Sequence, residues 1–408
     1  MRRGTPHVVI AGGGVGALEG LLALQDLAGD RVHVSVLTPT RHLTYRALSV
    51  AESFGTEPAQ RYDWEGIARD RGARWIPDVL QAVRRDAREL DTRDGPPVRY
   101  DALLLAVGAR PEPALPGAIT FAGPRDVLAL KETIEALAPD RQHRIAFVAM
   151  AGTAWTLPLY ELALLTAAHG RRRGLDLAIE LISPESAPLG VFGRVASAAV
   201  RRRLADAGVG LRMGTFPTEY ADGTLWLGSE GTIEVDLAVA LPHLRGPALS
   251  GLPHDSGGFV PVDGYGRVRG AERVWAVGDM TTRLIRQGGL AAQQADVAAA
   301  DIAAEVAGGD VEVQPYEPKL QGMLLTGAEP LYLRHDPHAL VRSEAAPEPP
   351  WWPAQKVVGH HLGPYLESLA GAGPRCCVGT TDPPTWSEGM PAGRASPRVQ
   401  GTLTRTET

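Results

Sequence analysis

Short apolar runs alternate with helical patterns along most of the chain. The run at residues 8–10 precedes a glycine-rich turn, an apolar helical pattern over residues 18–27 and a second apolar run at residues 32–37. An apolar run bounded by Gly or polar residues is typical of a buried strand, and two such runs around a helix make a βαβ unit. Similar runs follow at residues 102–107, 145–148, 177–182, 235–241 and 274–277. The pattern predicts an α/β protein with parallel sheets.

Length and composition divide the chain into parts. Its 408 residues exceed what one hydrophobic core usually organises, so we expect two main domains. The composition changes after about residue 343, where residues 344–350 are typical of a linker and residues 351–369 of a short ordered segment. Residues 371–408 are rich in Gly, Pro, Thr, Ser and Arg and have little to bury, which predicts a disordered tail.

Charge and cysteine content exclude several classes of function. The net charge of −6 gives no reason to expect a nucleic-acid partner. The N-terminus leaves no room for an export signal, and the longest mostly apolar stretches are shorter than the ~20 residues that cross a bilayer. The two cysteines, Cys376 and Cys377, are adjacent and form neither a disulfide framework nor a thiolate metal site. We therefore expect a cytoplasmic protein without a transmembrane segment.

The first βα turn contains the pattern Gly12-x-Gly14-x-x-Ala17. Gly12 permits a tight turn, Gly14 lets the backbone approach a pyrophosphate, and Ala17 allows close packing of the helix on the strand. An acidic residue often follows the second strand of such a unit and binds a ribose hydroxyl. Thr38 occupies that place, and its hydroxyl is a weaker candidate for the same contact.

Two distant segments complete a recognisable pattern. Residues 100–108 form an apolar strand that ends in small residues, and residues 273–279 form another strand that ends in Gly278-Asp279. With the N-terminal glycine turn, in this order and spacing, they resemble the pyridine-nucleotide-disulfide-oxidoreductase superfamily over about residues 7–335. The resemblance implies two Rossmann-like domains, the second inserted in the first, a non-covalent FAD, and oxidoreductase activity.

The same resemblance implies roles for individual residues. Asp279 is expected to bind the ribityl chain of FAD, and a helix beginning near residue 288 is expected to direct its N–H groups and dipole at the pyrimidine edge of the flavin. Arg286 and Tyr160 are candidates for the substrate side of the flavin. The full set of expected cofactor contacts is Gly12, Gly14, Ala17, Thr38, Leu80, Ala106, Gly108, Gly278, Asp279, Gly288, Gly289 and Leu290.

The electron donor is constrained by what the chain lacks. Residues 1–375 contain no cysteine, which excludes a disulfide reductase. In the second domain, Ala154, Thr156 and Leu159 stand where an NAD(P)H site would have glycines. Residues 155–161 are similar to the Pro-x-Tyr-Glu helix start of sulfide:quinone reductases, but Trp155 and, roughly, Met323 replace the cysteines of those enzymes. The resemblance to sulfide:quinone reductases and type II NADH dehydrogenases is therefore one of scaffold.

The expected plan places FAD in a domain of residues 1–115 and 246–305, with a degenerate second domain at 116–245 and a C-terminal segment at 306–370. Electrons or hydride would pass through the flavin to or from a small-molecule or quinone-like partner. Two alternatives stay open: a type II NADH:quinone oxidoreductase with an atypical nucleotide turn, and a flavin-binding protein without catalysis.

Two features near the C-terminus are interpreted as parts of the fold without a ligand-binding role. No Cys or carboxylate cluster is close to His360 and His361 in the sequence, so we interpret them as exposed residues and predict no metal site. Residues 351–369 are expected to pack on the body or form a homodimer contact in preference to a peripheral membrane contact. Gly359, Gly363 and Pro364 are expected to interrupt any helix there.

Overall fold

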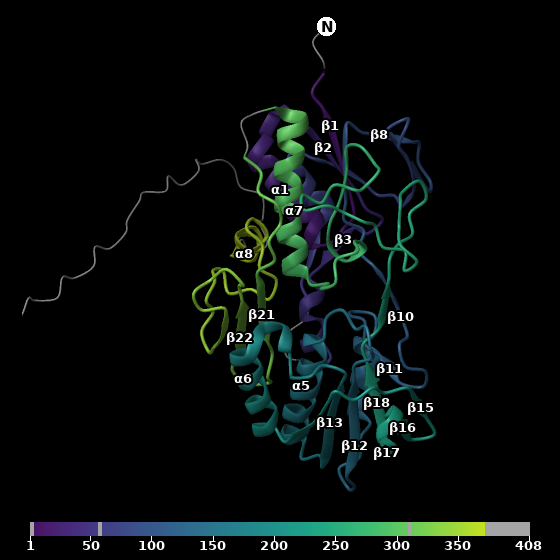
Figure 1. The fold of residues 1–408 in the computed structure, drawn as a ribbon, viewed down its shortest axis with the longest axis vertical. Helices are drawn as coiled ribbons and strands as arrows, with labels where there is room; N and C mark the ends of the chain where they lie inside the picture. The colour runs from purple at the N-terminus through teal and green to yellow at the C-terminus, as the bar shows by residue number, and fades with distance from the viewer. Residues whose placement is uncertain (1–3, 56–58, 309–311, 372–408) are drawn as a thin grey trace, which may run out of the picture.

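A computed structural model describes residues 4–55, 59–308 and 312–371 (Figure 1). Its first sheet has five strands in the order β20-β9-β1-β2-β5, and every neighbouring pair is parallel. The strands are β1 (His7–Ala11), β2 (His33–Leu37), β5 (Arg74–Ile76), β9 (Ala102–Leu105) and β20 (Val274–Ala276). The glycine turn, the apolar strand before residue 108 and the Gly-Asp strand are thus neighbours in one sheet.

Alternate residues of β1 face two different layers. Val8 and Ile10 pack with helices α1 (Val15–Ala28) and α7 (Gly288–Ile302), which lie side by side in Figure 1. Val9 and Ala11 pack with the antiparallel sheet β6-β7-β8 on the opposite face. That sheet contains β6 (Leu80–Arg84), β7 (Glu89–Thr92) and β8 (Val98–Arg99). Both faces of the parallel sheet are covered, which explains its continuous apolar strands.

Smaller elements surround the first sheet. They are β3 (His42–Thr44), α2 (Ser49–Glu52), β4 (Arg61–Asp63) and α3 (Trp64–Asp70). Helices α1 and α7 approach each other and the sheet closely because small residues line their contact. A Cβ added to Gly20 of α1 would lie 2.5 Å from Leu104 Cδ2 and 3.9 Å from Ala295 Cβ.

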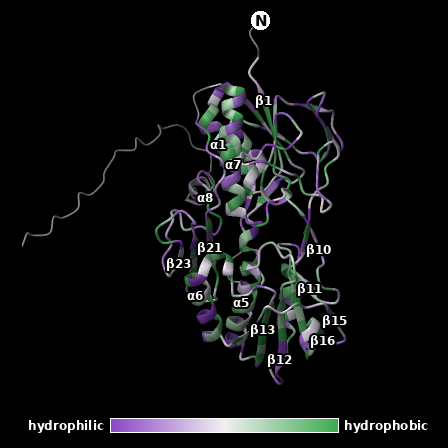
Figure 2. Ribbon diagram, in the orientation of Figure 1, coloured by the Kyte–Doolittle hydropathy of each residue, from purple (hydrophilic) through white to green (hydrophobic). Residues whose placement is uncertain are grey.

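A second five-stranded sheet has the order β11-β18-β12-β13-β14 and is also parallel. Its strands are β11 (Ile119–Thr120), β12 (His143–Val148), β13 (Leu177–Ser183), β14 (Val209–Met213) and β18 (Leu237–Ala240). One face packs against α4 (Val127–Glu135), α5 (Leu157–Arg173) and α6 (Gly193–Asp206). The other packs against a meander of β15 (Glu219–Ala221), β16 (Thr224–Trp226) and β17 (Thr232–Glu234). Figure 2 shows hydrophobic residues concentrated in the strands and hydrophilic ones on the outer side of α6.

The chain passes between the sheets twice, through β10 (Arg110–Glu112) and β19 (His243–Arg245). These strands pair with each other in antiparallel fashion, and Arg245 forms an ion pair with Glu112 at 3.0 Å. The predicted α/β fold, with one Rossmann-like unit inserted in the other, is confirmed. The domain limits at residues 115, 116, 245 and 246 remain a proposal, and the two crossings lie beside them.

The C-terminal segment corrects two expectations. It contains an antiparallel sheet of β21 (Leu320–Leu324), β22 (Leu331–His335) and β23 (Ser343–Ala346), followed by α8 (Leu362–Gly371). The linker predicted at residues 344–350 is wrong at its start, because residues 344–346 pair with β22. The predicted helix interruption is wrong for Gly363 and Pro364, which lie in the first turn of α8, where proline loses no intrahelical hydrogen bond, whereas Gly359 lies before the helix.

Residues 362–369 pack on the body of the protein: Leu362, Tyr365 and Leu366 join the core cluster that contains α1. No helix within the described residues is long and apolar enough to cross a bilayer. The predicted disordered tail, with Cys376 and Cys377, lies outside the described residues except for Gly371.

Candidate functional site

The glycine turn after β1 combines one tight position with one open position. Gly12 has φ +142°, and a Cβ added to it would lie 2.2 Å from the carbonyl oxygen of Ala106 at the end of β9. A Cβ on Gly14 would meet no atom within 4 Å. Gly14 is the N-cap of α1, so the helix N-terminus opens onto free space, and Ala17 is fully buried. This geometry suits a bound phosphate, which the helix dipole and free N–H groups attract.

Thr38 lies beside this turn at the end of β2 but is almost completely enclosed. Its side chain is 2% exposed, its Oγ1 lies 3.1 Å from Thr40 Oγ1, and a Cβ on Gly13 would lie 2.3 Å from the same Oγ1. A ribose cannot reach that hydroxyl in this conformation, because Gly13 and Thr40 already surround it. Thr40, whose hydroxyl lies next to that of Thr38, is the exposed residue of the two. The sequence pattern did not point to Thr40.

Two further positive-φ glycines border the same region. Gly108, with φ +74°, follows β9 and has open space where a side chain would project. Gly278, with φ +72°, follows β20, and its N–H donates a 2.8 Å hydrogen bond to Gln294 Oε1 of α7. The buried Gln294 therefore fixes the turn that carries Asp279.

The carboxylate of Asp279 lies in a largely enclosed place with two arginines nearby. Burial raises the pKa of Asp279, while the positive charges of Arg286 and Arg46 act in the opposite direction. No group within the described residues donates a hydrogen bond to this carboxylate, although its side chain keeps partial contact with solvent. A largely enclosed carboxylate without a protein donor suits a ligand that brings hydroxyl groups.

Arg286 occupies a supporting position in this structure. Its Nε donates to the backbone oxygen of Asp279 at 3.1 Å, and its guanidinium lies 3.8 Å from the ring centre of Phe259. These contacts hold the turn at residues 278–281. Arg46, exposed in a short 3₁₀ helix (Arg46–Leu48), is a second cation near Asp279, and no sequence signal had singled it out.

The start of α7 is more covered than the resemblance implied. Gln287 caps the helix by accepting from Leu290 N at 3.0 Å, and a Cβ on Gly288 would lie 3.2 Å from Val357. Gly289 is similarly close to Val358 O, at 3.3 Å. Leu290 is buried in the core cluster of the second sheet, and Leu80 packs at the edge of the cluster under β6.

Tyr160 lies away from any open surface. Its side chain is fully buried, and its hydroxyl donates to Glu185 Oε2 at 2.8 Å, while Ser183 Oγ donates to the same oxygen at 3.0 Å. Burial and the negative charge of Glu185 raise the pKa of Tyr160, so the hydroxyl stays protonated. The expectation that Tyr160 faces a substrate is contradicted by this burial, and the sequence could not show that Glu185 is its partner.

The segment between β12 and the start of α5 has larger residues where a nucleotide turn has glycines. Leu159 is fully buried, Thr156 is 8% exposed, and the Trp155 ring meets Phe192 edge-on at 5.8 Å between centroids. Gly152, with φ +83°, is the glycine that remains there. A dinucleotide turn needs backbone where Thr156 and Leu159 place side chains.

A buried ion pair joins α5 to the C-terminal segment. Lys356 Nζ lies 2.6 Å from Glu161 Oε2, with the side chains 7% and 0% exposed, and Glu161 Oε1 accepts from Leu325 N at 2.9 Å. Burial raises the pKa of Glu161, and the nearby Lys356 opposes that rise. Lys356 directly precedes Val357, which covers Gly288, so the pair lies beside the start of α7. Its partners are 195 residues apart, too far for the sequence pattern to connect.

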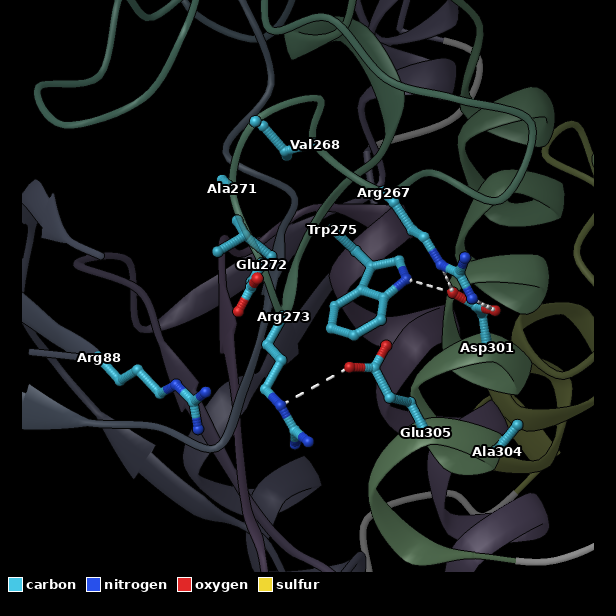
Figure 3. A pocket seen from close by; sticks show the side chains of 12 residues that line it. Arg88, Arg267, Val268, Ala271, Glu272, Arg273, Trp275, Asp301, Ala304 and Glu305 are labelled. Atoms are coloured by element: carbon cyan, nitrogen blue, oxygen red, sulfur yellow. Dashed lines mark hydrogen bonds and ion pairs between the residues drawn. The ribbon is translucent and has the colours of Figure 1, made fainter. Parts of the chain in front are cut away.

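A separate hollow of about 830 Å³ lies near the C-terminal end of α7 (Figure 3). Most of the charged groups that line it are paired. Asp301 accepts from Arg267 at 2.6 and 2.7 Å and from Trp275 Nε1 at 2.7 Å, and Arg273 lies 3.6 Å from Glu305. These contacts fasten α7 to β20, at the helix end opposite to Gly288, and we assign the hollow a structural role.

The model of the pyridine nucleotide-disulphide oxidoreductase family matches residues 6–298. The chain belongs to this family. The resemblance inferred from the glycine turn and the Gly278-Asp279 strand is confirmed, and the protein is an oxidoreductase.

Solved structures share the fold at low identity. Sulfide:quinone oxidoreductase from the hyperthermophilic bacterium Aquifex aeolicus is 16% identical, with 84% of this chain and 87% of that chain covered and a TM-score of 0.76. A ferredoxin reductase from Rhodopseudomonas palustris is 20% identical over 81% and 82%, with a TM-score of 0.61. An NAD-dependent persulfide reductase from A. fulgidus is 17% identical over 81% and 64%, with the same TM-score of 0.61. These likenesses concern the fold, and the site must be argued from this chain's own residues.

Proposed function

We propose that this family member is an FAD-dependent oxidoreductase that binds the flavin without a covalent bond. The observation that carries the proposal is the Asp279 carboxylate, which is largely enclosed and accepts no hydrogen bond from the described residues, on a strand of the same sheet as the open glycine turn. Bound FAD supplies hydride or single-electron transfer, for which the protein provides binding and electrostatics.

The chain's own groups divide the work of holding such a ligand. The N-terminus of α1 at Gly14 attracts the pyrophosphate, because Gly14 leaves the helix N–H groups accessible. Asp279 accepts hydrogen bonds from ribityl hydroxyls. Arg286 and Gln294 hold the turn that carries Asp279, and Arg46 adds positive charge close by.

We further propose that neither NADH nor NADPH is the physiological donor. Leu159 and Thr156 replace glycines of the second nucleotide turn, and residues 1–375 contain no cysteine for thiol chemistry. A small-molecule or quinone-like partner is consistent with the missing glycines of the second turn and with the missing cysteines. Sulfide:quinone oxidoreductase, with the same fold, acts by its name on a quinone, and this supports an acceptor of that class.

One observation favours the alternative of a type II NADH:quinone oxidoreductase. Glu185 follows β13, the second strand of the inserted unit, where a Rossmann fold places the acid that binds a ribose. The two donors are separated by anaerobic stopped-flow mixing of the oxidised protein with each nucleotide. Reduction over minutes at millimolar NADH supports our proposal, and reduction within milliseconds at micromolar NADH establishes the alternative.

The flavin itself is tested by the absorption spectrum of the purified protein and by identification of the cofactor that heat releases. We expect FAD. Gly14→Val should abolish binding while leaving the fold intact, since its side chain enters free space that the pyrophosphate needs. Asp279→Ala should weaken binding by about 1–3 kcal/mol through lost hydrogen bonds.

The matched control is Gly4→Val, because Gly4 also has no neighbour within 4 Å but lies before β1, outside the glycine turn. It should retain a full complement of FAD. Recovery of FMN, or full FAD in both Gly14→Val and Asp279→Ala, would show that the proposed site is wrong.

A further inference from the structure

Three potential metal ligands meet on the side of the first unit formed by α1, α7 and the start of α8. Asp296 comes from α7, and His360 and His361 directly precede α8. One ligand atom from each lies within 4.8 Å of the other two, and His361 Nε2 lies 4.0 Å from Asp296 Oδ1. The histidines line a hollow of about 490 Å³ together with Asp26 and Arg71.

The Asp296 carboxylate is incompletely satisfied. Its Oδ1 atom is buried and has no hydrogen-bond partner among the described residues. The nearby Glu19 carboxylate, fully buried on α1, adds negative charge to the same place. A buried oxygen without a donor, next to a second carboxylate, is unfavourable unless a cation or a proton compensates it.

We propose that Asp296, His360 and His361 bind one divalent cation of the zinc class, with the remaining coordination position open to the hollow. Two imidazole nitrogens and a carboxylate oxygen are ligands that Zn²⁺ commonly takes. Zinc lies about 2.0–2.2 Å from such ligands, so neighbouring ligand atoms are roughly 3.3 Å apart. The 4.0 Å between His361 and Asp296 therefore closes by less than an ångström, and the exposed His360 has room to rotate toward them.

Glu19 acts as a positioning residue in this site. Its two carboxylate oxygens accept from His361 N at 2.8 Å and Leu362 N at 2.6 Å, which fixes the backbone that carries the histidines. A bound ion would join α7 to the segment before α8. It would thus stabilise the docked C-terminal segment, because a ligand that binds only the folded state raises stability.

The test is isothermal titration of ZnCl₂ into the full-length protein without an affinity tag, with melting temperatures measured in ZnCl₂ and in EDTA. Cys376 and Cys377 are replaced by Ser in every variant, since adjacent thiols bind zinc independently. We expect one Zn²⁺ per chain and a higher melting temperature with zinc. Asp296→Asn, His360→Ala and His361→Ala should each weaken binding by at least about tenfold.

His243→Ala is the matched control, because His243 is an exposed histidine on β19, outside the cluster; it should bind zinc like the parent. Asp296→Asn removes a carboxylate beside Glu19, so in EDTA it should melt no lower than the parent, and its loss of binding cannot come from unfolding. Absence of binding, or binding that survives all three substitutions, overturns the proposal. No part of this experiment depends on the flavin, so its failure leaves the proposed function untouched.

Discussion

The two parallel-sheet units have the same strand–turn–helix–strand arrangement but carry complementary halves of a nucleotide site. In the first unit, Gly12 and Gly14 form an open turn, while the second strand ends at the enclosed Thr38. In the second unit, β13 is followed by Glu185, but Thr156 and Leu159 stand where the turn before α5 would need glycines.

The difference shows which half matters for phosphate binding. A missing ribose acid removes one hydrogen-bonding partner of the ligand. Larger side chains in place of the glycines keep its phosphates away from the helix N-terminus. In the second unit the corresponding acid, Glu185, accepts a hydrogen bond from the Tyr160 hydroxyl. Under the proposed function, the first unit therefore binds the dinucleotide and the second does not.

The largest effect that should sharpen this comparison comes from adding one methyl group to each turn. Gly12→Ala places a Cβ 2.2 Å from the Ala106 carbonyl and should eliminate FAD binding and lower the melting temperature markedly. Gly152→Ala projects into open space in the second unit and should lose only about 1–2 kcal/mol, from its positive φ. Flavin-to-protein ratios and thermal melts measure both. Equal losses in the two variants would contradict the distinction between the turns.

The next effect concerns the ion pair between the second unit and the C-terminal segment. Lys356→Met leaves Glu161 buried without a cation and should lower the free energy of unfolding by about 3–5 kcal/mol at neutral pH. Because burial raises the pKa of Glu161, the deficit should shrink as the pH falls and this carboxylate takes up a proton. Urea denaturation at several pH values measures it.

Lys319→Met serves as the control for that experiment, since Lys319 is 58% exposed and its nearest acid, Asp336, is 3.8 Å away. It should change stability by no more than about 0.5 kcal/mol. The double variant Lys356→Met with Glu161→Gln should recover part of the loss. A pH-independent deficit in Lys356→Met would show that lost packing, and not the charge of Glu161, is responsible.

The smallest effect comes from releasing the acid of the second unit. Tyr160→Phe removes one of the hydroxyl donors to Glu185 and should destabilise the protein by about 1–3 kcal/mol. Reduction by NADH should remain slow, because Leu159 and Thr156 still replace the glycines of the turn. Stopped-flow reduction of the variant measures this. Fast reduction would mean that the engaged acid, and not the missing glycines, closes the second unit to nucleotides.

The sequence predicted those features that depend on neighbouring residues. The apolar runs at residues 8–10 and 274–277 correspond to β1 and β20 because strands buried on both faces need continuous apolar side chains. The open position at Gly14 followed from the spacing of glycines between a strand and a helix. Short strands such as β6 and β23 were missed, since half-exposed strands have no such run.

Contacts between distant segments could not be predicted. Nothing near Tyr160 in the chain identifies Glu185 as its partner, and Glu161 meets Lys356 only because the C-terminal segment returns across the start of α7. The same limit affected His360 and His361. They were interpreted as exposed residues because the nearest carboxylate, Asp296, is separated from them by more than 60 positions and meets them only in the folded chain.

The order of the strands also determines what a growing chain can complete on the ribosome. All strands of the second sheet lie between residues 119 and 240, whereas the first sheet obtains β20 only at residues 274–276. Synthesis therefore supplies every strand of the inserted unit first, although it begins later in the gene. Until β20 emerges, β9 presents an unpaired hydrogen-bonding edge of the kind to which nascent chains are vulnerable. Lys356 leaves the ribosome about eighty residues later still, so Glu161 acquires its counter-ion only after the strands of both sheets have emerged.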